Sequence, residues 1–351
     1  MEGIGFNMHA ALGLLLKKRT IIVLFAMVLF VVLALYAELV GYLYHAATEH
    51  MRIMFARKPI AQEIATGNLS PDDKAKLRVV LDVRGFASRY LGLPDNGSYT
   101  VYSDIGRENV GWNIYATPKL SVVPRRWCFP IAGCVVYRGF FAKADALAFA
   151  RKLSESEDLD VYVGPFDAYS TLGYFNDPVL SSHLALDEYR LAALIIHELA
   201  HQRLYIPGNS RVNEAFATVV EREGLVRWMR QTGREASIPR VQASWDAQDI
   251  KIREIVAARD ALKELYGSAL GPREKEIEKA KLLDHLSKAV CAGGCSGITF
   301  PKANENTFEI NNAYLVPFDT YFGEYDTLRS LLTGVSGDFE RFYREVQRIY
   351  D

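Results

Sequence analysis

The chain contains 351 residues, of which 50% are hydrophobic and 24% are charged, and its formal net charge is −1. This composition is ordinary for a globular protein that buries a sizeable core. A charge so close to zero provides no basic field for DNA or RNA, so we expect no nucleic-acid partner.

The N-terminal segment has the pattern of a membrane anchor. Lys17-Lys18-Arg19 precedes an apolar run from Ile21 to Val40 in which Glu38 is the only charge. About 20 apolar residues suffice for a helix to cross a bilayer, and a basic flank usually stays in the cytoplasm. Residues 1–42 are therefore predicted to form a cytoplasmic tip and a single-pass anchor in a bacterial inner membrane, with the catalytic domain in the periplasm. A cleaved signal peptide is the alternative, although its apolar region usually spans about 7–15 residues.

Residues 43–176 are predicted to combine helices with a small mixed α/β subdomain. A helix should begin after Ser70, because Ser-Pro-Asp-Asp supplies an N-cap, a first-turn proline and early acidic residues. Between Ser98 and Phe175, short runs rich in β-branched and aromatic residues alternate with turn residues. This pattern predicts strands crossed by one helix over 142–153.

Four cysteines form two closely spaced pairs, Cys128 with Cys134 and Cys291 with Cys295. Local disulfides fit an oxidising compartment, although four cysteines allow three connectivities and free buried thiols are the alternative. Neither spacing matches a zinc knuckle with accompanying histidines, so no structural zinc site is expected at these residues.

Residues 177–351 are predicted to be mainly helical. A helix expected over 184–204 carries the apolar run LAALII directly before His197, so one of its faces should be buried. The predicted fold class is therefore α+β: an N-terminal transmembrane helix, a small mixed sheet subdomain, and a mainly helical half with this helix at the junction.

The segment His197-Glu198-Leu-Ala-His201 has the spacing of a zinc site. Residues four apart lie on one face of a helix, so both imidazoles can reach a single ion. Glu198 lies about 100° round the helix, where it can hold a metal-bound water instead of acting as a ligand. Zinc lowers the pKa of such a water to about 7, and the glutamate can take its proton as the water attacks a carbonyl. An amphipathic helix that contains two histidines by chance is the alternative.

A catalytic zinc ion needs a third protein ligand. The metzincin pattern requires glycine and a third histidine within about ten residues of His201, and QRLYIPGNS lacks them at the right places. Pro207-Gly208-Asn209 instead predicts a turn into a new helix that contains Glu214 in its first turn. A carboxylate in the apolar run AFATVV needs a partner, which zinc would supply. Alternatively, the helix dipole alone favours an acidic residue near the N-terminus.

Two further residues are candidates for supporting the ligands. Glu221 shares the helix face of Glu214 two turns later, where it can accept a hydrogen bond from the outer nitrogen of a ligating histidine. Asn213, directly before Glu214, is placed in the same supporting shell. A solvated surface position is the alternative for Glu221.

These motifs resemble those of glu-zincins, and more closely those of a bacterial family of zinc aminopeptidases that are usually exported lipoproteins. The matching stretches are ARKPI at 56–60, GCVVYRGFF at 133–141, STLGYFNDPVL at 170–180, IIHELAHQRLY at 195–205, NEAFATVVEREG at 213–224 and NNAYL at 311–315. The chain departs from the family at Tyr42, where the family has a lipobox cysteine, so no lipid can attach there.

The resemblance implies a zincin-like helical half with His197, His201 and Glu214 as zinc ligands and Glu198 as the catalytic glutamate. It also implies that Ser170, Thr171, Leu172 and Gly173 lie beside the cleft, where an edge strand could pair with an extended peptide. An internal strand is the alternative for these four residues. Tyr321 is the candidate for stabilising the tetrahedral intermediate, with Tyr314 as a second choice.

The predicted function is therefore zinc-dependent hydrolysis of peptide bonds outside the cytoplasmic membrane, by an aminopeptidase. The expected cofactor is Zn2+ and the expected partners are a peptide substrate and the membrane, with no particular oligomeric state predicted. An envelope endopeptidase and a non-catalytic, zinc-stabilised scaffold or binding protein are the alternatives.

Overall fold

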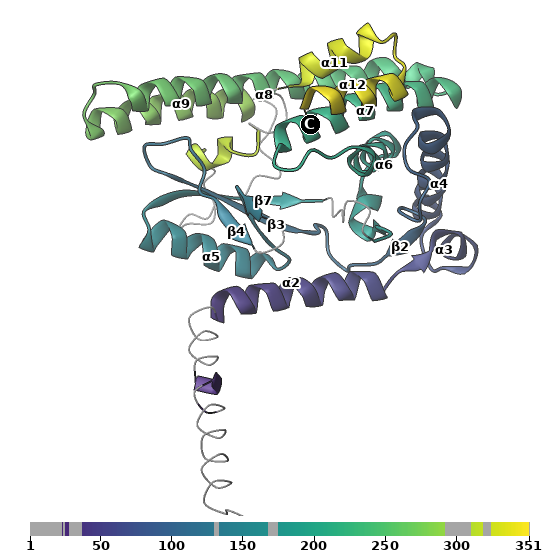
Figure 1. Cartoon of the computed structure of the whole chain (residues 1–351), viewed down its shortest axis with the longest axis horizontal. Coiled ribbons are helices and arrows are strands. Elements are labelled where there is room, and N and C mark those ends of the chain that lie inside the picture. Colours follow the sequence, from purple (N-terminus) through teal and green to yellow (C-terminus); the bar gives the residue numbers. More distant parts are fainter. Residues whose placement is uncertain are drawn as a thin grey trace, which may run out of the picture. The chain divides into compact units, whose positions relative to one another are not determined.

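The computed structural model describes residues 23, 25–27, 37–129, 133–167, 175–291, 310–318 and 324–350 (Figure 1). The chain divides into two units, Met1–Arg52 and Ile53–Asp351, which are considered separately. In the second unit the fold is α+β and mostly helical, with small sheets, as the sequence predicts.

The predicted membrane anchor is wrong, and so are the single-pass inner-membrane location and the periplasmic placement derived from it. Within the described part of the chain, no helix is both long enough and apolar enough to cross a bilayer. The helix α2 (Ala37–Phe55), which overlaps the end of the predicted span, places His45, Glu49, His50 and Arg52 among its apolar residues. Most of the apolar run from Ile21 onward lies outside the described residues.

The described strands of the second unit form two three-stranded sheets and a hairpin instead of one mixed sheet. The first sheet has the order β1-β2-β8, the second has the order β6-β3-β7, and the hairpin pairs β4 with β5. Their bounds are β1 Lys58–Pro59, β2 Val101–Ser103, β3 Gly111–Pro118, β4 Trp127–Phe129, β5 Gly133–Val135, β6 Arg138–Phe140, β7 Leu159–Phe166 and β8 Val179–Leu180.

One face of the second sheet is covered by α5 (Lys143–Ser156), which runs beneath the strands in Figure 1. Ile114 of β3 lies opposite Val163 of β7 in the antiparallel register, and both are fully buried. Ala150 and Leu153 of α5 pack in the same apolar cluster. The other face of the sheet is covered as well, because Tyr162 of β7 packs in a second apolar cluster with Tyr314 and Leu315, so buried residues follow one another along β7.

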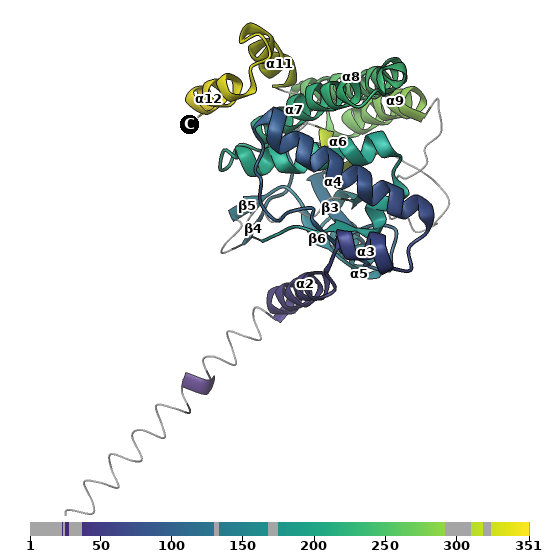
Figure 2. The ribbon, with the colours of Figure 1, turned by 90° about the vertical axis from the view of Figure 1, so that its right-hand side faces the viewer.

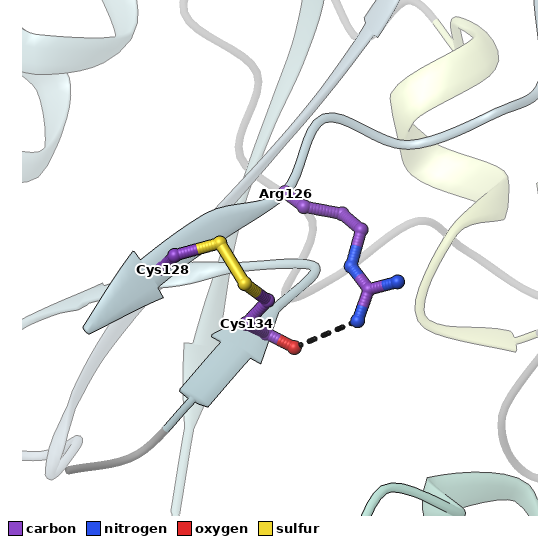
Figure 3. Close-up of a disulfide and its surroundings, with 3 residues drawn as sticks. All are labelled: Arg126, Cys128 and Cys134. Atoms are coloured by element: carbon purple, nitrogen blue, oxygen red, sulfur yellow. Dashed lines mark hydrogen bonds between the residues drawn. A yellow bond between two sulfur atoms is a disulfide. The ribbon is translucent and has the colours of Figure 1, made fainter. Parts of the chain in front are cut away.

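The hairpin β4–β5 is closed by a disulfide between Cys128 and Cys134 (Figure 3). These residues lie opposite each other in the antiparallel register, and Arg126 donates a hydrogen bond to the Cys134 carbonyl at 3.1 Å. The predicted local pairing is confirmed for these two cysteines. Cys295 and the side chain of Cys291 lie outside the described residues.

The remaining helices of the second unit build its main core and a long helical hairpin. Their bounds are α3 Ile60–Thr66, α4 Pro71–Leu91, α6 Glu188–Arg203, α7 Ser210–Gln231, α8 Ile238–Gly267, α9 Pro272–Cys291, α11 Tyr325–Gly334 and α12 Phe339–Tyr350. Both views show α8 and α9 running side by side as the hairpin (Figures 1 and 2). The predicted start of α4 is confirmed, because the Ser70 hydroxyl accepts the Asp73 N–H at 3.1 Å.

The main apolar core lies where α4, α6 and α7 meet, with α11 and α12 packed against α7. Trp228 of α7 is fully buried and donates its indole N–H to Asp82 of α4 at 2.8 Å. Gly224 of α7 lies close to both other helices. A Cβ there would lie 2.6 Å from a methyl group of Leu91 and 3.2 Å from one of Ile196. This position therefore sets how closely α7 approaches both other helices.

Candidate active site and metal centre

The helix α6 presents the histidines from a well-capped and deeply buried position. The Asp187 carboxylate accepts the N–H groups of Tyr189 at 3.0 Å and Arg190 at 3.1 Å, which satisfies the first turn. Leu191, Ile195 and Leu199 are fully buried in the main core, so packing fixes the rotation of the helix. His197 and His201 consequently face the adjoining helix α7.

A tight turn brings α7 back against α6. Gly208 has a φ of +78°, which glycine adopts without strain, and Asn209 caps α7 by accepting the Val212 N–H at 3.3 Å. The buried Asn213 side chain accepts the Ile206 N–H at 2.7 Å and donates to the Ile206 carbonyl at 2.9 Å. Asn213 therefore anchors the turn that precedes Glu214.

The turn gathers three potential ligands at one point. His197, His201 and Glu214 each offer one ligand atom, and these atoms all lie within 4.8 Å of one another. The two Nε2 atoms are 3.1 Å apart, and the Glu214 carboxylate lies 3.5 Å from His197 Nε2 and 3.7 Å from His201 Nε2. The described residues thus contain a His/His/Glu cluster with the composition of a metal site.

The surroundings of the cluster fit a bound cation. Glu221 accepts a hydrogen bond from His197 Nδ1 at 2.9 Å, which leaves Nε2 directed at the other two ligands. His201 is 8% exposed, and its Nδ1 has no hydrogen-bond partner among the described residues. Two imidazoles and one carboxylate form a donor set that zinc favours. The residues present therefore fit the metal that the sequence predicts.

The pKa values of the three residues of the cluster are shifted in different directions. Burial opposes a charge on His197, but its hydrogen bonds to Glu214 and Glu221 outweigh burial and raise its pKa. Burial and the neighbouring His197 lower the pKa of His201 to about 4. Burial alone would raise the pKa of Glu214, yet contact with His197 lowers it. A protonated His197 can donate a hydrogen bond to a neutral His201 across the 3.1 Å between their Nε2 atoms. The cluster then carries more negative than positive charge.

Glu198 follows His197 on α6, and its pKa is shifted toward neutrality. Its side chain is buried, with 7% of the residue exposed. Burial raises the pKa of Glu198 to about 7, against the effect of His197. Three nearby carboxylates act in the same direction as burial: Glu214, Asp177 and Glu221. A carboxyl group with a pKa near neutrality can both accept and release a proton under physiological conditions.

A cavity of about 490 Å³ opens beside Glu198, and we call it the α6–α8 groove. On its α6 side the groove is lined by residues that recur at helical spacing: Arg190, Leu194, His197 and Glu198. The α7 wall includes Glu221 and Leu225, and the α8 wall includes Arg240, Trp245 and Gln248. A cavity of this size holds a small ligand or a few residues of a peptide.

The other residues singled out in the sequence lie either outside the described residues or in the apolar core. Ser170, Thr171, Leu172, Gly173 and Tyr321 lie outside the described residues. Tyr314 is buried, and its ring lies 5.3 Å from that of Tyr162 and 5.2 Å from that of Phe318, which explains it as core.

Sequence reasoning missed the contribution of α8. Arg222, next to Glu221, makes a bidentate ion pair with Asp249 of α8, with N–O distances of 2.7 and 2.8 Å. The guanidinium also lies 5.4 Å from the ring centre of Trp245. The Asp249 hydrogen bond raises the pKa of Arg222 against the effect of burial, so this cation remains charged. These contacts attach α8 to the helix that carries Glu214 and Glu221. In the sequence, polar residues recur in α8 at spacings of four and eight, and this recurrence is the signal that could have indicated a polar face on this helix.

Comparison with known proteins gives one match. A family model described as "Putative aminopeptidase" matches residues 41–351, which is most of the chain and includes every residue of the cluster. No curated protein and no solved structure shows significant similarity.

Proposed function

Since the chain belongs to the "Putative aminopeptidase" family, we propose that it is a zinc-dependent metallopeptidase that removes residues from the N-termini of peptides. The observation that supports this proposal most directly is the convergence of His197, His201 and Glu214 beside a buried Glu198. A purely structural metal site does not require Glu198, whereas a hydrolytic site needs a base.

In this proposal, His197, His201 and Glu214 hold the zinc ion. When bound, zinc would act as a Lewis acid that polarises the peptide carbonyl and lowers the pKa of water to about 7. Glu221 keeps the His197 ring oriented through its contact with Nδ1, which is 2.9 Å long. This contact also favours the tautomer that leaves Nε2 free of hydrogen.

Glu198 moves the proton. Its carboxylate takes a proton from the water that attacks the peptide carbonyl, and it then delivers that proton to the nitrogen of the leaving amine. Its burial beside the α6–α8 groove keeps bulk water away from the transferred proton. The substrate in this proposal is a peptide with a free N-terminus.

The experiment uses the full-length protein with zinc content measured by mass spectrometry. Peptides with free and with acetylated N-termini are incubated with the wild-type protein and with Glu198→Gln. We expect cleavage of the free peptides only, about one zinc ion per chain in both proteins, and activity that is 10²–10⁴-fold lower in the variant.

Three outcomes would contradict parts of this proposal. Full activity of Glu198→Gln, or activity that survives chelation, would exclude the mechanism. Cleavage of acetylated peptides would indicate an endopeptidase. Stoichiometric zinc that raises thermal stability, with no turnover on a peptide library, would indicate a scaffold or binding protein.

A further inference from the structure

The α6–α8 groove has residues of opposite charge at its two ends. Glu198 and Glu221 line one end, beside His197. Arg190 and Arg240 line the same groove from the first turn of α6 and the start of α8. Because Arg190 precedes His197 by two helical turns, the guanidinium groups belong at the end away from the candidate metal ligands.

Contacts between helices establish the same order for α8. The guanidinium of Arg240 lies 5.5 Å from the ring centre of Tyr189, which adjoins Arg190 on α6. Further along α8, Trp245 contacts Arg222, the residue that follows Glu221 on α7. The groove therefore runs from the carboxylates to the arginines along both walls.

The two arginines are available for a ligand. Both are exposed, and neither makes an ion pair within the described part of the chain. Two acidic residues also line this region, Asp167 and Asp187. Asp187 caps α6 by accepting backbone N–H groups. Burial raises the pKa of Asp167, and the charge of Arg190 opposes this effect without cancelling it. The arginine end therefore holds two guanidinium groups and two carboxylates, of which Asp187 already accepts two backbone N–H groups of α6.

The length of the groove sets what can span it. Glu198 and Arg190 are eight residues apart on one helix, which corresponds to about 12 Å along the axis. An extended peptide advances about 3.3 Å per residue, so roughly three to four residues separate a bond at Glu198 from a group at Arg190. A carboxylate at that distance would lie at the end of the groove that Arg190 and Arg240 line, and guanidinium groups are favourable partners for carboxylates.

We propose that Arg190 and Arg240 bind a carboxylate of the peptide substrate, three to four residues beyond the bond that is cut. This inference rests on the proposed function for the identity of the reaction, and it adds a preference for short peptides. The carboxylate is either the C-terminus of a peptide of about four to five residues or an acidic side chain at the same position. Both groups are carboxylates, and the experiment distinguishes between them.

Binding is measured by calorimetry with zinc-supplemented, full-length Glu198→Gln, so that no turnover is required. The ligands are tetra-alanine as the free acid, tetra-alanine amide, an amidated tetrapeptide ending in aspartate, and octa-alanine as acid and amide. We expect the tetra-alanine acid to bind about tenfold more tightly than its amide, and octa-alanine to show no such difference. Tight binding of the amidated aspartate peptide would assign the same subsite to an acidic side chain.

The arginines are then replaced in the same background. Arg190→Gln and Arg240→Gln should each abolish most of the preference for acid over amide, while the affinity for the amide stays unchanged. Arg253→Gln removes an exposed arginine from the same helix α8 outside the groove, and it should leave the preference intact. Equal binding of the acid, the amide and the amidated aspartate peptide, no measurable binding, or an equal loss of affinity for all three in the arginine variants would overturn the inference.

The two proposals fail in different ways. Arginine-dependent binding of the acid, with no cleavage of any peptide by the wild-type protein, would refute the peptidase and leave the carboxylate site. Efficient cleavage with no preference between acid and amide would leave the peptidase and refute the carboxylate site.

Discussion

Replacing Glu221 tests whether a residue that touches no candidate ligand atom controls the metal site. Glu221 accepts from His197 Nδ1 at 2.9 Å, on the side of the ring opposite the cluster. Loss of such a partner usually weakens metal binding by about 10- to 100-fold, or roughly 1.4–2.7 kcal/mol. We expect Glu221→Gln to lie near the lower value, because the amide oxygen can still accept the hydrogen bond, and Glu221→Ala to lie near the upper value.

The assay is competition for zinc against a chromogenic chelator at pH 7.5, with circular dichroism to verify folding. Glu223→Gln is the matched control, because Glu223 lies on the same helix and pairs instead with Arg227 at 2.7 Å. The control should bind zinc like the wild-type protein. Unchanged affinity in Glu221→Ala, or the same loss in Glu223→Gln, would refute the argument that the contact with Nδ1 positions His197.

Three other predictions concern stability. Burial lowers the pKa of His183 to about 4 from its ordinary 6.5, so the unfolded chain binds protons more readily, and urea unfolding should show roughly 3 kcal/mol lost as the pH falls from 7 to 4. Asn213→Ala should cost about 1–3 kcal/mol, because the buried N–H and carbonyl of Ile206 lose their partner, and zinc affinity should fall with it. Gly224→Ala should cost about 1–3 kcal/mol in the same unfolding assay, since its Cβ would lie 2.6 Å from Leu91.

Each of these predictions has an internal control. His183→Asn should flatten the pH dependence of stability relative to the wild-type protein, and an unchanged slope would contradict the assignment. Zinc affinity that survives a destabilising Asn213→Ala would show that the turn does not position Glu214. Gly85→Ala on α4 meets nothing closer than 3.7 Å and should be neutral or stabilising, so an equal loss there would dismiss the packing argument for Gly224.

Local features of the fold could be predicted because local chemistry determines them. The Ser70 cap, the α6 helix and the turn after it depend on neighbouring residues and on the period of the apolar positions. The approach of Glu214 to His201 also followed from the sequence, because a short turn between two helices leaves few arrangements.

The groove could not be predicted in the same way. Its α8 wall is brought to α6 by contacts between distant residues, such as the Arg222–Asp249 ion pair and the packing of Arg240 on Tyr189. A single sequence does not reveal which polar residues of one helix will meet another helix. The division of the strands into two sheets escaped prediction for the same reason, since β8 pairs with β2 across a long stretch of chain.

The prediction of the anchor rested on the length and the basic flank of one apolar run, and most of that run lies outside the described residues. The described helix α2 begins at Ala37, inside the predicted span, and continues to Phe55 through charged and polar residues.

The three residues of the His/His/Glu cluster all come from a short piece of chain between His197 and Glu214. A cation bound there would close only a small loop, and the chain entropy removed by closing a loop grows slowly with its length. The helices that carry the cluster are already held by the apolar core and by the Asn213 turn. We therefore expect that a cation bound at this cluster could dissociate without unfolding the chain, unlike the metal of a domain that folds only around its ion.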